Sequence, residues 1–414
     1  MRPQGPPSLT PSQSNGSGPF NVARWLTGFG LGLVGDQIFY LALAWTAAQV
    51  AAPAMAGLIV GIGAAPRAVF LLFGGAVSDR FGPRPVALVS DAARLLTMLV
   101  FGILAITSSG SVPELIILAL LFGLIDAFFL PAVGALPTRI VTQEHLAETQ
   151  TIRSAVQRIS TVAGPPLGGY LLSTFDFATA ILANVALFTG SCTALYFTRE
   201  LPQEKLDDKD PAEVGLVQNA WQGLRYTLSA PGLRAMLVLI TIAESAYTGP
   251  FTTGLTLLAR ESHWQASDAG MVLAFFGGGA CISALGLTIF KADLNAGILA
   301  LASITAMGPA VAAIGLSPNL GLAALCATVA GVFSGISATV LVALFLTQTD
   351  PSHAGRVMAA LNLATLGAAP VSYFFSGLIA SVFSPTAVFM AAGALLCCSG
   401  LLGLMSPAVR NQRF

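Results

Sequence analysis

Four ionisable residues lie inside long apolar stretches of the sequence, where a charge is costly. Asp36 is in LGLVGDQIFYLALAW at residues 31–45, and Arg67, Asp126 and Glu244 have similar surroundings. A charge at the centre of a lipid bilayer costs about 2.5–3.5 kcal/mol even on lenient scales, so such residues need partners or water. Intramembrane acids are therefore candidates for binding a proton or a charged substrate.

Three acids and one arginine leave carboxylates without a full charge partner. Each of the four residues is near the middle of its apolar stretch, so we expect all of them at one level of the membrane. Unpaired buried acids are suited to carrying a proton near neutral pH. For Arg67 we favour the alternative, a static ion pair with Asp36, because a buried arginine usually neutralises a neighbour. Asp91 and Arg94, three residues apart, are interpreted as a local structural pair.

Aromatic residues recur on the helix faces that carry the three acids. By helical spacing, these aromatic candidates are Tyr40, Phe122, Phe129, Tyr247 and Phe251. Aromatic faces hold apolar and cationic groups, and a carboxylate supplies the counter-charge. The pattern predicts a cavity for an amphiphilic, often cationic, molecule.

The elements that must position these residues are membrane helices. Of the 414 residues, 55% are hydrophobic and 9% charged, against about 25% charged in a soluble domain. Apolar stretches of about 20 residues suit helices that cross a bilayer, and they are too evenly apolar for barrel strands. We predict an all-α membrane protein with twelve transmembrane helices, near 22–48, 56–78, 85–108, 114–137, 150–173, 177–198, 234–256, 269–290, 295–315, 320–346, 356–380 and 386–406.

The twelve helices divide into two six-helix halves that echo each other. The acid Asp36 recurs as Glu244, and Pro165 recurs as Pro370 at nearly the same offset. This organisation is typical of transporters whose halves rock about a site at the membrane midplane. The predicted segments are a disordered tail 1–19, a first bundle 20–198, a linker 199–231 with an amphipathic surface helix, a second bundle 232–406 and a tail 407–414.

Basic residues indicate the orientation. Outside the predicted helices, Arg260 is the only Lys or Arg on its side of the membrane. The positive-inside rule therefore places both termini and the linker on the cytoplasmic side. We expect the protein in the cell membrane, that is, the inner or plasma membrane. The net charge of zero gives no indication of nucleic-acid binding, and all five cysteines fall in predicted helices, where we expect free thiols.

The stretch GGAVSDRFGPRP at 74–85 resembles the loop signature of the major facilitator superfamily, Gly-x-x-x-Asp-Arg-x-Gly followed by basic residues. The matching residues are Gly75, Asp79, Arg80, Gly82 and Arg84, whereas Pro83 replaces the first trailing basic residue. The resemblance implies a conformational gate, in which Asp79 meets a helix N-terminus or an arginine such as Arg139. The alternative is a plain turn that carries cytoplasmic charges.

The stretch AGPPLGGY at 163–170 resembles the end of the antiporter signature in proton-coupled exporters. Ser160 and Thr151 replace the upstream glycines of that signature, and the matching residues are Gly164, Pro165, Gly168 and Gly169. Small residues beside a proline favour a bent helix that packs closely on its neighbours. The alternative is ordinary packing of membrane helices, which uses the same residues.

These motifs, with GDQIFYLALAW, DAARLL and AFFLPAVGALP, resemble the drug:proton antiporter branch that includes macrolide and siderophore exporters. The resemblance implies the major facilitator fold and proton-coupled efflux of an amphiphilic drug, antibiotic or siderophore by alternating access. Asp126 replaces the membrane arginine that many such antiporters carry in the fourth helix. The alternatives are an uptake or lipid-translocating transporter of the same fold, and a non-transporting membrane sensor.

No pattern in the chain indicates an enzyme. The three histidines are far apart in the sequence and lack metal-ligand spacing, and no phosphate-binding glycine motif is present. We therefore expect no cofactor and no metal. The expected protein is a monomer whose partners are a small-molecule substrate, protons and membrane lipid.

Overall fold

The computed structural model describes residues 18–108, 110–201, 216–289, 295–350 and 353–412. The first group of helices is α2 (Pro19–Val50), α3 (Pro53–Phe81), α4 (Pro83–Ser108), α5 (Val112–Ala135), α6 (Pro137–Ile140), α7 (Gln143–Thr174) and α8 (Phe177–Phe197). The second group is α9 (Leu216–Ser229), α10 (Pro231–Gly249), the π-helical turn η1 (Pro250–Gly254), α11 (Leu255–Glu261), α12 (Ala266–Ile289), α13 (Ala296–Gly315), α14 (Leu320–Thr347), α15 (Ala354–Val382), α16 (Pro385–Met405) and α17 (Pro407–Arg410).

Helix starts follow from local sequence. Proline opens many of the helices, where its missing N–H would have no intrahelical partner in any case. Side-chain caps begin others: the Asp176 carboxylate accepts from the backbone N–H of Thr179 at 2.7 Å, and the Asn319 side-chain oxygen accepts from that of Leu322 at 2.9 Å. Short capped turns therefore join long apolar helices.

The all-helical membrane fold is confirmed in the described part of the chain. Ten of the described helices are long and apolar enough to cross a membrane, and counting the bent pair Trp221–Ser229 and Pro231–Glu261 as one span adds an eleventh. The predicted stretch at 150–173 lies in α7, which is not among them. The N-terminal half of α7 is polar, with Glu144, Glu148, Arg153 and Arg158.

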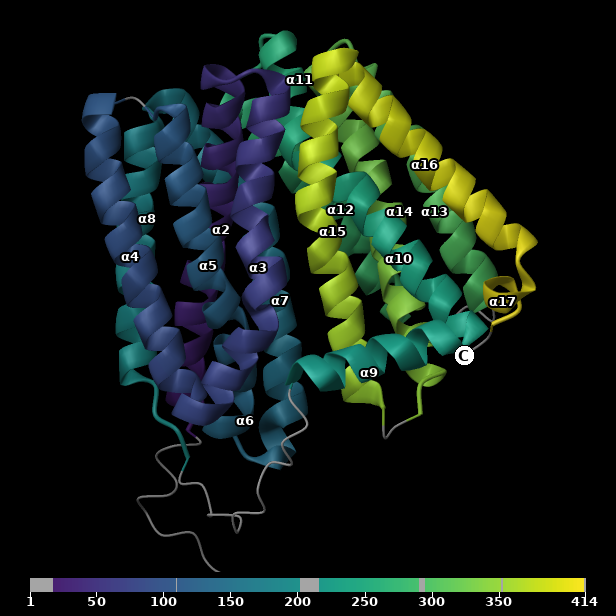
Figure 1. Ribbon diagram of the computed structural model, residues 1–414, viewed down its shortest axis with the longest axis horizontal. Coiled ribbons are helices and arrows are strands. Elements are labelled where there is room, and N and C mark those ends of the chain that lie inside the picture. The colour runs from purple at the N-terminus through teal and green to yellow at the C-terminus, as the bar shows by residue number, and fades with distance from the viewer. Residues whose placement is uncertain (1–17, 109, 202–215, 290–294, 351–352, 413–414) are drawn as a thin grey trace, which may run out of the picture.

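The helices form two groups that lie side by side (Figure 1), with α2–α8 on one side and α9–α17 on the other. Helix α9 lies across the end of the molecule at which α6 is found, and α11 lies at the opposite end. We call these the α9 end and the α11 end. Helix α9 accounts for part of the predicted linker, and residues 1–17 and 202–215 of the predicted tail and linker lie outside the described residues.

Glycines allow two of the closest helix contacts. A Cβ atom on Gly123 of α5 would overlap the carbonyl oxygen of Gly63 in α3. Between the two groups, a Cβ atom on Gly377 of α15 would lie 2.8 Å from the Cα of Gly57 in α3. Small residues let membrane helices approach this closely. The second contact joins the groups through α3 and α15.

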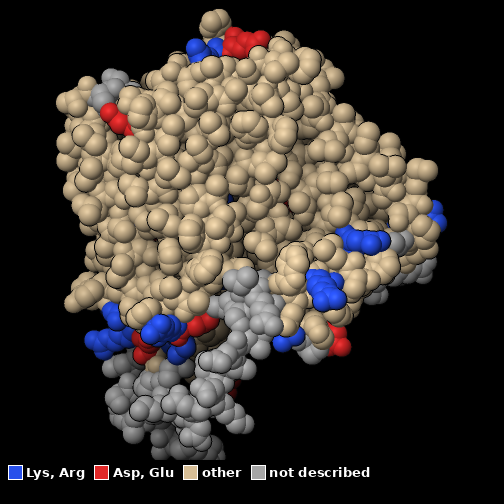
Figure 2. All heavy atoms as spheres, in the orientation of Figure 1, with Lys and Arg blue, Asp and Glu red and all other residues tan. Residues whose placement is uncertain are grey.

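The charged side chains gather at the two ends of the molecule (Figure 2). In this view a wide band of almost entirely uncharged residues separates the α9 end, where basic side chains lie among a few acidic ones, from a few charges at the α11 end. This distribution is the one expected of a protein whose middle faces lipid.

Candidate functional site

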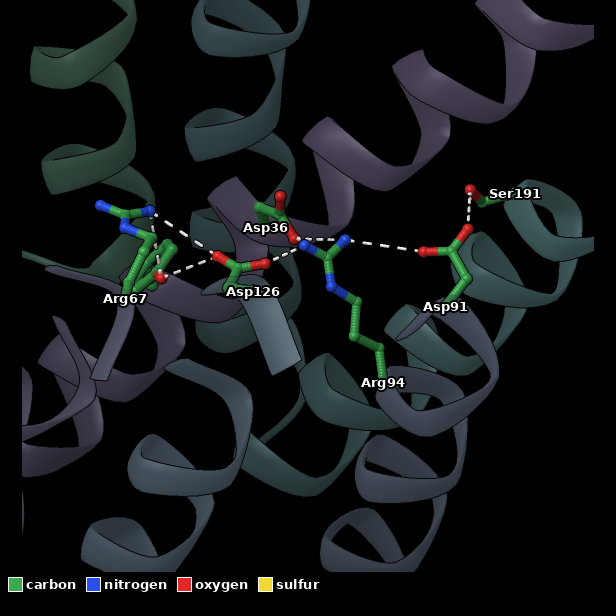
Figure 3. A network of polar contacts seen from close by, with 7 residues as sticks. Asp36, Arg67, Asp91, Arg94, Asp126 and Ser191 are labelled. Atoms are coloured by element: carbon green, nitrogen blue, oxygen red, sulfur yellow. Dashed lines mark hydrogen bonds and ion pairs between the residues drawn. The ribbon is translucent and has the colours of Figure 1, made fainter. Parts of the chain in front are cut away.

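A buried network of ion pairs and hydrogen bonds joins helices α2, α4, α5 and α8 of the first group (Figure 3). Arg94 of α4 lies between Asp91 on one side and Asp36 and Asp126 on the other. Its Nη1 is 3.4 Å from Oδ1 of Asp36 and 3.6 Å from Oδ1 of Asp91, and its Nη2 donates a hydrogen bond to Oδ1 of Asp126. Ser191 of α8 donates to Oδ2 of Asp91 at 2.5 Å.

Aromatic rings enclose the Arg94 guanidinium. Its central carbon lies 3.7 Å from the ring centroid of Phe129 and 5.4 Å from that of Phe122, within range of a cation–π interaction. Phe188 of α8 contributes a third ring at 5.5 Å. Arg94 has no exposed surface. Such a cation can be tolerated only because carboxylates and aromatic faces replace its water.

Tyr40 and Arg67 connect this network to open space. The Tyr40 hydroxyl donates to Oδ2 of Asp126 at 3.2 Å, and Nη1 of Arg67 lies 3.6 Å from the same oxygen. Arg67 also donates to the Tyr40 hydroxyl at 3.4 Å. The Arg67 side chain is 18% exposed, whereas that of Asp126 is 1% exposed. Asp126 is therefore separated by the Tyr40 and Arg67 side chains from a cavity that both of them line.

A cavity of about 710 Å³ lies between the two groups of helices. The first group contributes Gln37, Tyr40 and Leu41 of α2, Arg67 of α3, and Ser154, Gln157, Arg158, Thr161 and Pro165 of α7. The second group contributes residues of α10, η1, α12, α14 and α15, among them Glu244, Tyr247, Phe251, Phe276 and Tyr373. Its volume falls in the range of small-molecule sites.

Glu244 is the acid on the second group's wall of the cavity. Tyr247, one turn further along α10, interacts with its carboxylate. The ring centroids of Tyr247 and Phe276 are 5.5 Å apart, and those of Phe251 and Phe276 are 4.4 Å apart. This wall is therefore an aromatic surface with one carboxylate.

The structure corrects the predicted ion pairing. Arg67 pairs with Asp126 and not with Asp36, whose partner is Arg94. The local pair of Asp91 and Arg94 exists but is only part of the larger network. Arg94 is the functional candidate that sequence reasoning missed. The signal was its position near the middle of α4, well inside an apolar stretch.

The structure also corrects two of the predicted cavity aromatics. Tyr40, Tyr247 and Phe251 line the cavity. Phe122 and Phe129 are fully buried and pack on Arg94 instead. Asp126 is itself buried, and Phe122 and Phe129, four residues before it and three after it, share its buried face of α5.

The loop signature lies at the α9 end, where α3 ends. Asp79 and Arg80 are exposed, Gly82 has the positive φ of 90° that favours glycine, and Arg84 donates to the carbonyl of Tyr196 at 2.5 Å. The ion pairs between described residues do not include one of Asp79 with Arg139 of α6. A Cβ atom on Gly75 would have open space, so this glycine is not needed for close packing.

The second motif lies where α7 meets both groups. Within the first group, a Cβ atom on Gly164 would meet the Gln37 side chain, and one on Gly168 would lie 3.1 Å from the Cα of Ile38. Gly169 faces Ala266 at the start of α12, and Gly270 of α12 packs on the carbonyl of Pro165. The motif therefore supplies the close contact between α7 and α12.

Polar contacts also join the two groups at the α11 end. Arg260 of α11 donates to the backbone carbonyl of Ala48 and lies 3.5 Å from that of Ala51, both at the end of α2. The backbone N–H of Ser267 donates to the Ser173 hydroxyl at 2.8 Å. Among the described residues, no group of histidine, cysteine or acidic side chains is arranged to hold a metal.

Comparisons with known proteins agree with this arrangement. The sequence profile described as Major Facilitator Superfamily matches residues 25–298. The chain is 25% identical over 387 residues to "Multidrug efflux pump Tap" of Mycolicibacterium fortuitum, covering 91% of this chain and 93% of that protein. It is 26% identical over 368 residues to "Enterobactin exporter EntS" of Shigella flexneri, covering 86% and 84%. The crystal structure of the nucleoside transporter NupG shares the fold, with a TM-score of 0.74 at 11% identity over 93% of this chain and 99% of that chain.

Proposed function

The chain belongs to the Major Facilitator Superfamily, a family of secondary transporters and not of enzymes, and we propose that it exports amphiphilic small molecules in exchange for protons. The observation that carries this proposal is the position of the cavity. Arg67 and Tyr40 link the wall formed by the first group of helices to the buried aspartates. Glu244 lies on the wall formed by the second group. A substrate in the cavity would thus lie between the buried aspartates of the first group and Glu244 of the second.

Alternating access requires that the cavity open to one side at a time. The contacts of Gly57 with Gly377, and of Arg260 with Ala48, support closure at the α11 end. The lining continues along α7 from Pro165 to Ser154, toward the α9 end. Basic residues gather at the α9 end (Figure 2), so the positive-inside rule favours it as the cytoplasmic end, with both termini there. We assign this arrangement to an inward-facing state.

The proposed proton carriers are Asp36, Asp126 and Glu244. Asp126 exchanges protons with the cavity by way of Tyr40 and Arg67, and Glu244 faces the cavity directly. A proton that enters from outside neutralises a carboxylate, which weakens its attraction for the neighbouring arginine or for a polar group of the substrate. Release of substrate outside and of the proton inside then completes the cycle.

The cavity lining modifies the expected substrate class. Its charged members are Arg67, Arg158 and Glu244, so the walls are not the acidic surface that a purely cationic ligand would favour. Together with the aromatic residues of the second wall, they suit an amphiphilic molecule with both an apolar body and polar groups. The names of the relatives, a multidrug efflux pump and an enterobactin exporter, are consistent with export of such molecules.

The two motifs have proposed roles outside the cavity. The residues of the loop signature, Asp79 above all, stabilise one arrangement of the two halves and touch no ligand. The α7 motif provides a surface on which α7 and α12 can separate and close again. We propose that the protein works as a monomer, with 20–198 and 232–406 as its moving halves.

Transport by purified protein in lipid vesicles tests this proposal. With an acidic lumen, a cationic, a neutral and an acidic amphiphilic dye are added outside in turn. We expect at least one dye to accumulate in the lumen and to leave when a protonophore collapses the gradient. Dye uptake only when the gradient is reversed, with an alkaline lumen, would identify a symporter. Movement of a fluorescent lipid placed in the same vesicles, but of no dye, would identify a lipid translocator, and no movement of either would favour a sensor. Each result would overturn the proposal.

A further inference from the structure

The ionic network contains more carboxylates than cations. Three aspartates, Asp36, Asp91 and Asp126, lie within ion-pair distance of Arg94 or Arg67. If every group were ionised, the network would carry a net negative charge.

Burial makes such a net charge costly. Asp36 is 6% exposed, Asp91 0% and Asp126 1%, and Arg94 is fully buried. An uncompensated charge in this environment costs several kcal/mol, and in practice the group binds a proton instead. A site sealed from water therefore favours the state in which two carboxylates are ionised and one is neutral.

Unsatisfied atoms mark where that proton belongs. Oδ1 of Asp36, Oδ1 of Asp91 and Nη1 of Arg94 are all buried and make no hydrogen bond with a described residue. Nη1 lies 3.4 and 3.6 Å from the two oxygens, close enough for attraction but too far for a good hydrogen bond. One guanidinium edge is thus shared between two carboxylates that face it from different helices.

No other described group near the network supplies the missing positive charge. The titratable neighbours are Tyr40 of α2, Cys192 of α8 and Tyr373 of α15, which are neutral near pH 7 when unperturbed. On α7, Arg153 stacks on Phe29 of α2. A proton is the ligand that restores the charge balance.

We propose that Asp36, Asp91 and Asp126 form a single proton-binding unit that holds one shared proton at neutral pH, with Arg94 as its fixed cation. When carboxylates interact this strongly, the proton belongs to the group and not to one residue. Ser191 fixes Asp91 at the closed end, and Tyr40 with Arg67 forms the end that meets the cavity. This inference deepens the proposed function, because it assigns the coupling proton to the whole unit.

Infrared spectroscopy of the resting protein tests the unit without substrate or gradient. A protonated carboxyl group has a carbonyl band that a carboxylate lacks. At pH 7 we expect Asp36→Asn and Asp91→Asn each to remove the signal of one protonated carboxyl, because two acids then face two arginines. The double variant should lose no more of this carbonyl band than either single variant loses. Glu148→Gln, an exposed change on α7, is the matched control and should leave the band unchanged.

Two results would overturn the proposal. One is a double variant that loses twice the signal of a single variant, and the other is a band that neither variant changes. If the variants do not fold, the wild type and Glu244→Gln still decide the matter, because both must show a protonated carboxyl at pH 7. A wild type that shows the shared proton but moves no dye would refute export and leave this inference standing.

Discussion

Nη1 of Arg94 in α4 lies 3.4 Å from Oδ1 of Asp36 in α2, so the intramembrane acid of the first helix is held by a cation from two helices further along the chain. The same guanidinium donates to Asp126 of α5. Three helices of the first group are therefore joined by one buried charge. Rocking of the two groups would move this network as a unit, while its contact with the cavity through Arg67 could change.

Removal of Arg94 should destabilise the protein strongly. Arg94→Gln leaves buried carboxylates without their cation, and loss of one partner of a buried pair typically costs about 3–5 kcal/mol. We expect a large fall in the thermal melting temperature in detergent. Arg158→Gln, an exposed change on the cavity wall, should leave it nearly unchanged. Adding Asp91→Asn to Arg94→Gln should recover part of the loss, and an equal fall for both arginine variants would contradict the buried network.

The charge network shows which part of the site could be predicted from the sequence. Asp36, Asp126 and Glu244 could be selected because a charge in an apolar stretch is a local signal. Arg94 carries the same signal, but its spacing from Asp91 suggested a local pair, and its true partners could not be read from the sequence. Its contacts with α2 and α5 depend on how distant helices pack. The same limit explains Phe122 and Phe129, which flank Asp126 but face Arg94.

The fold was more predictable than the site because apolar length is itself a local property. The membrane helices of the described chain follow the predicted stretches closely. The exception is α7, whose N-terminal half faces the cavity with Ser154, Gln157 and Arg158 and is therefore polar. A helix that lines water carries a weaker hydropathy signal than one that faces lipid.

The contact of Arg260 with α2 should bias the protein toward closure at the α11 end. The guanidinium meets the carbonyls of Ala48 and Ala51, at the negative end of the α2 dipole. Arg260→Gln should weaken this contact and increase the population open at the α11 end. Spin labels at Val50 and His263, in a background without the native cysteines, would report this as longer distances. Unchanged distance distributions would contradict a role for Arg260 in closure.

The helix contact at Gly63 and Gly123 should tolerate no added side chain. Gly123→Ala places a methyl group against the Gly63 carbonyl, so we expect a loss of about 1–3 kcal/mol of stability from overpacking. Gly278→Ala of α12 has open space around its Cβ atom and should be neutral or slightly stabilising. The melting temperatures of the two variants, measured in the same detergent, compare their stabilities. Equal effects would show that α3 and α5 are not this close.

The loop signature should affect turnover more than binding. Asp79 is exposed at the end of α3, far along the helix from the cavity residue Arg67. Asp79→Asn should therefore slow dye transport severalfold while dye affinity, measured by fluorescence polarisation, stays within about twofold. A loss of affinity as large as the loss of transport would place Asp79 in the binding site instead.

Coupling between dye and proton is the central claim, and the proton movement that a dye gradient drives measures it most directly. Vesicles at equal pH on both sides, with a lumenal pH reporter, receive a transported dye from outside. For the wild type and the control Glu148→Gln, dye entry should drive protons out and make the lumen alkaline. For Asp36→Asn, the dye should still equilibrate while lumenal pH stays constant, and the folded protein should be at least as stable as the wild type, because an amide is less costly to bury than a carboxylate. Alkalinisation by Asp36→Asn equal to that of the wild type would contradict the account.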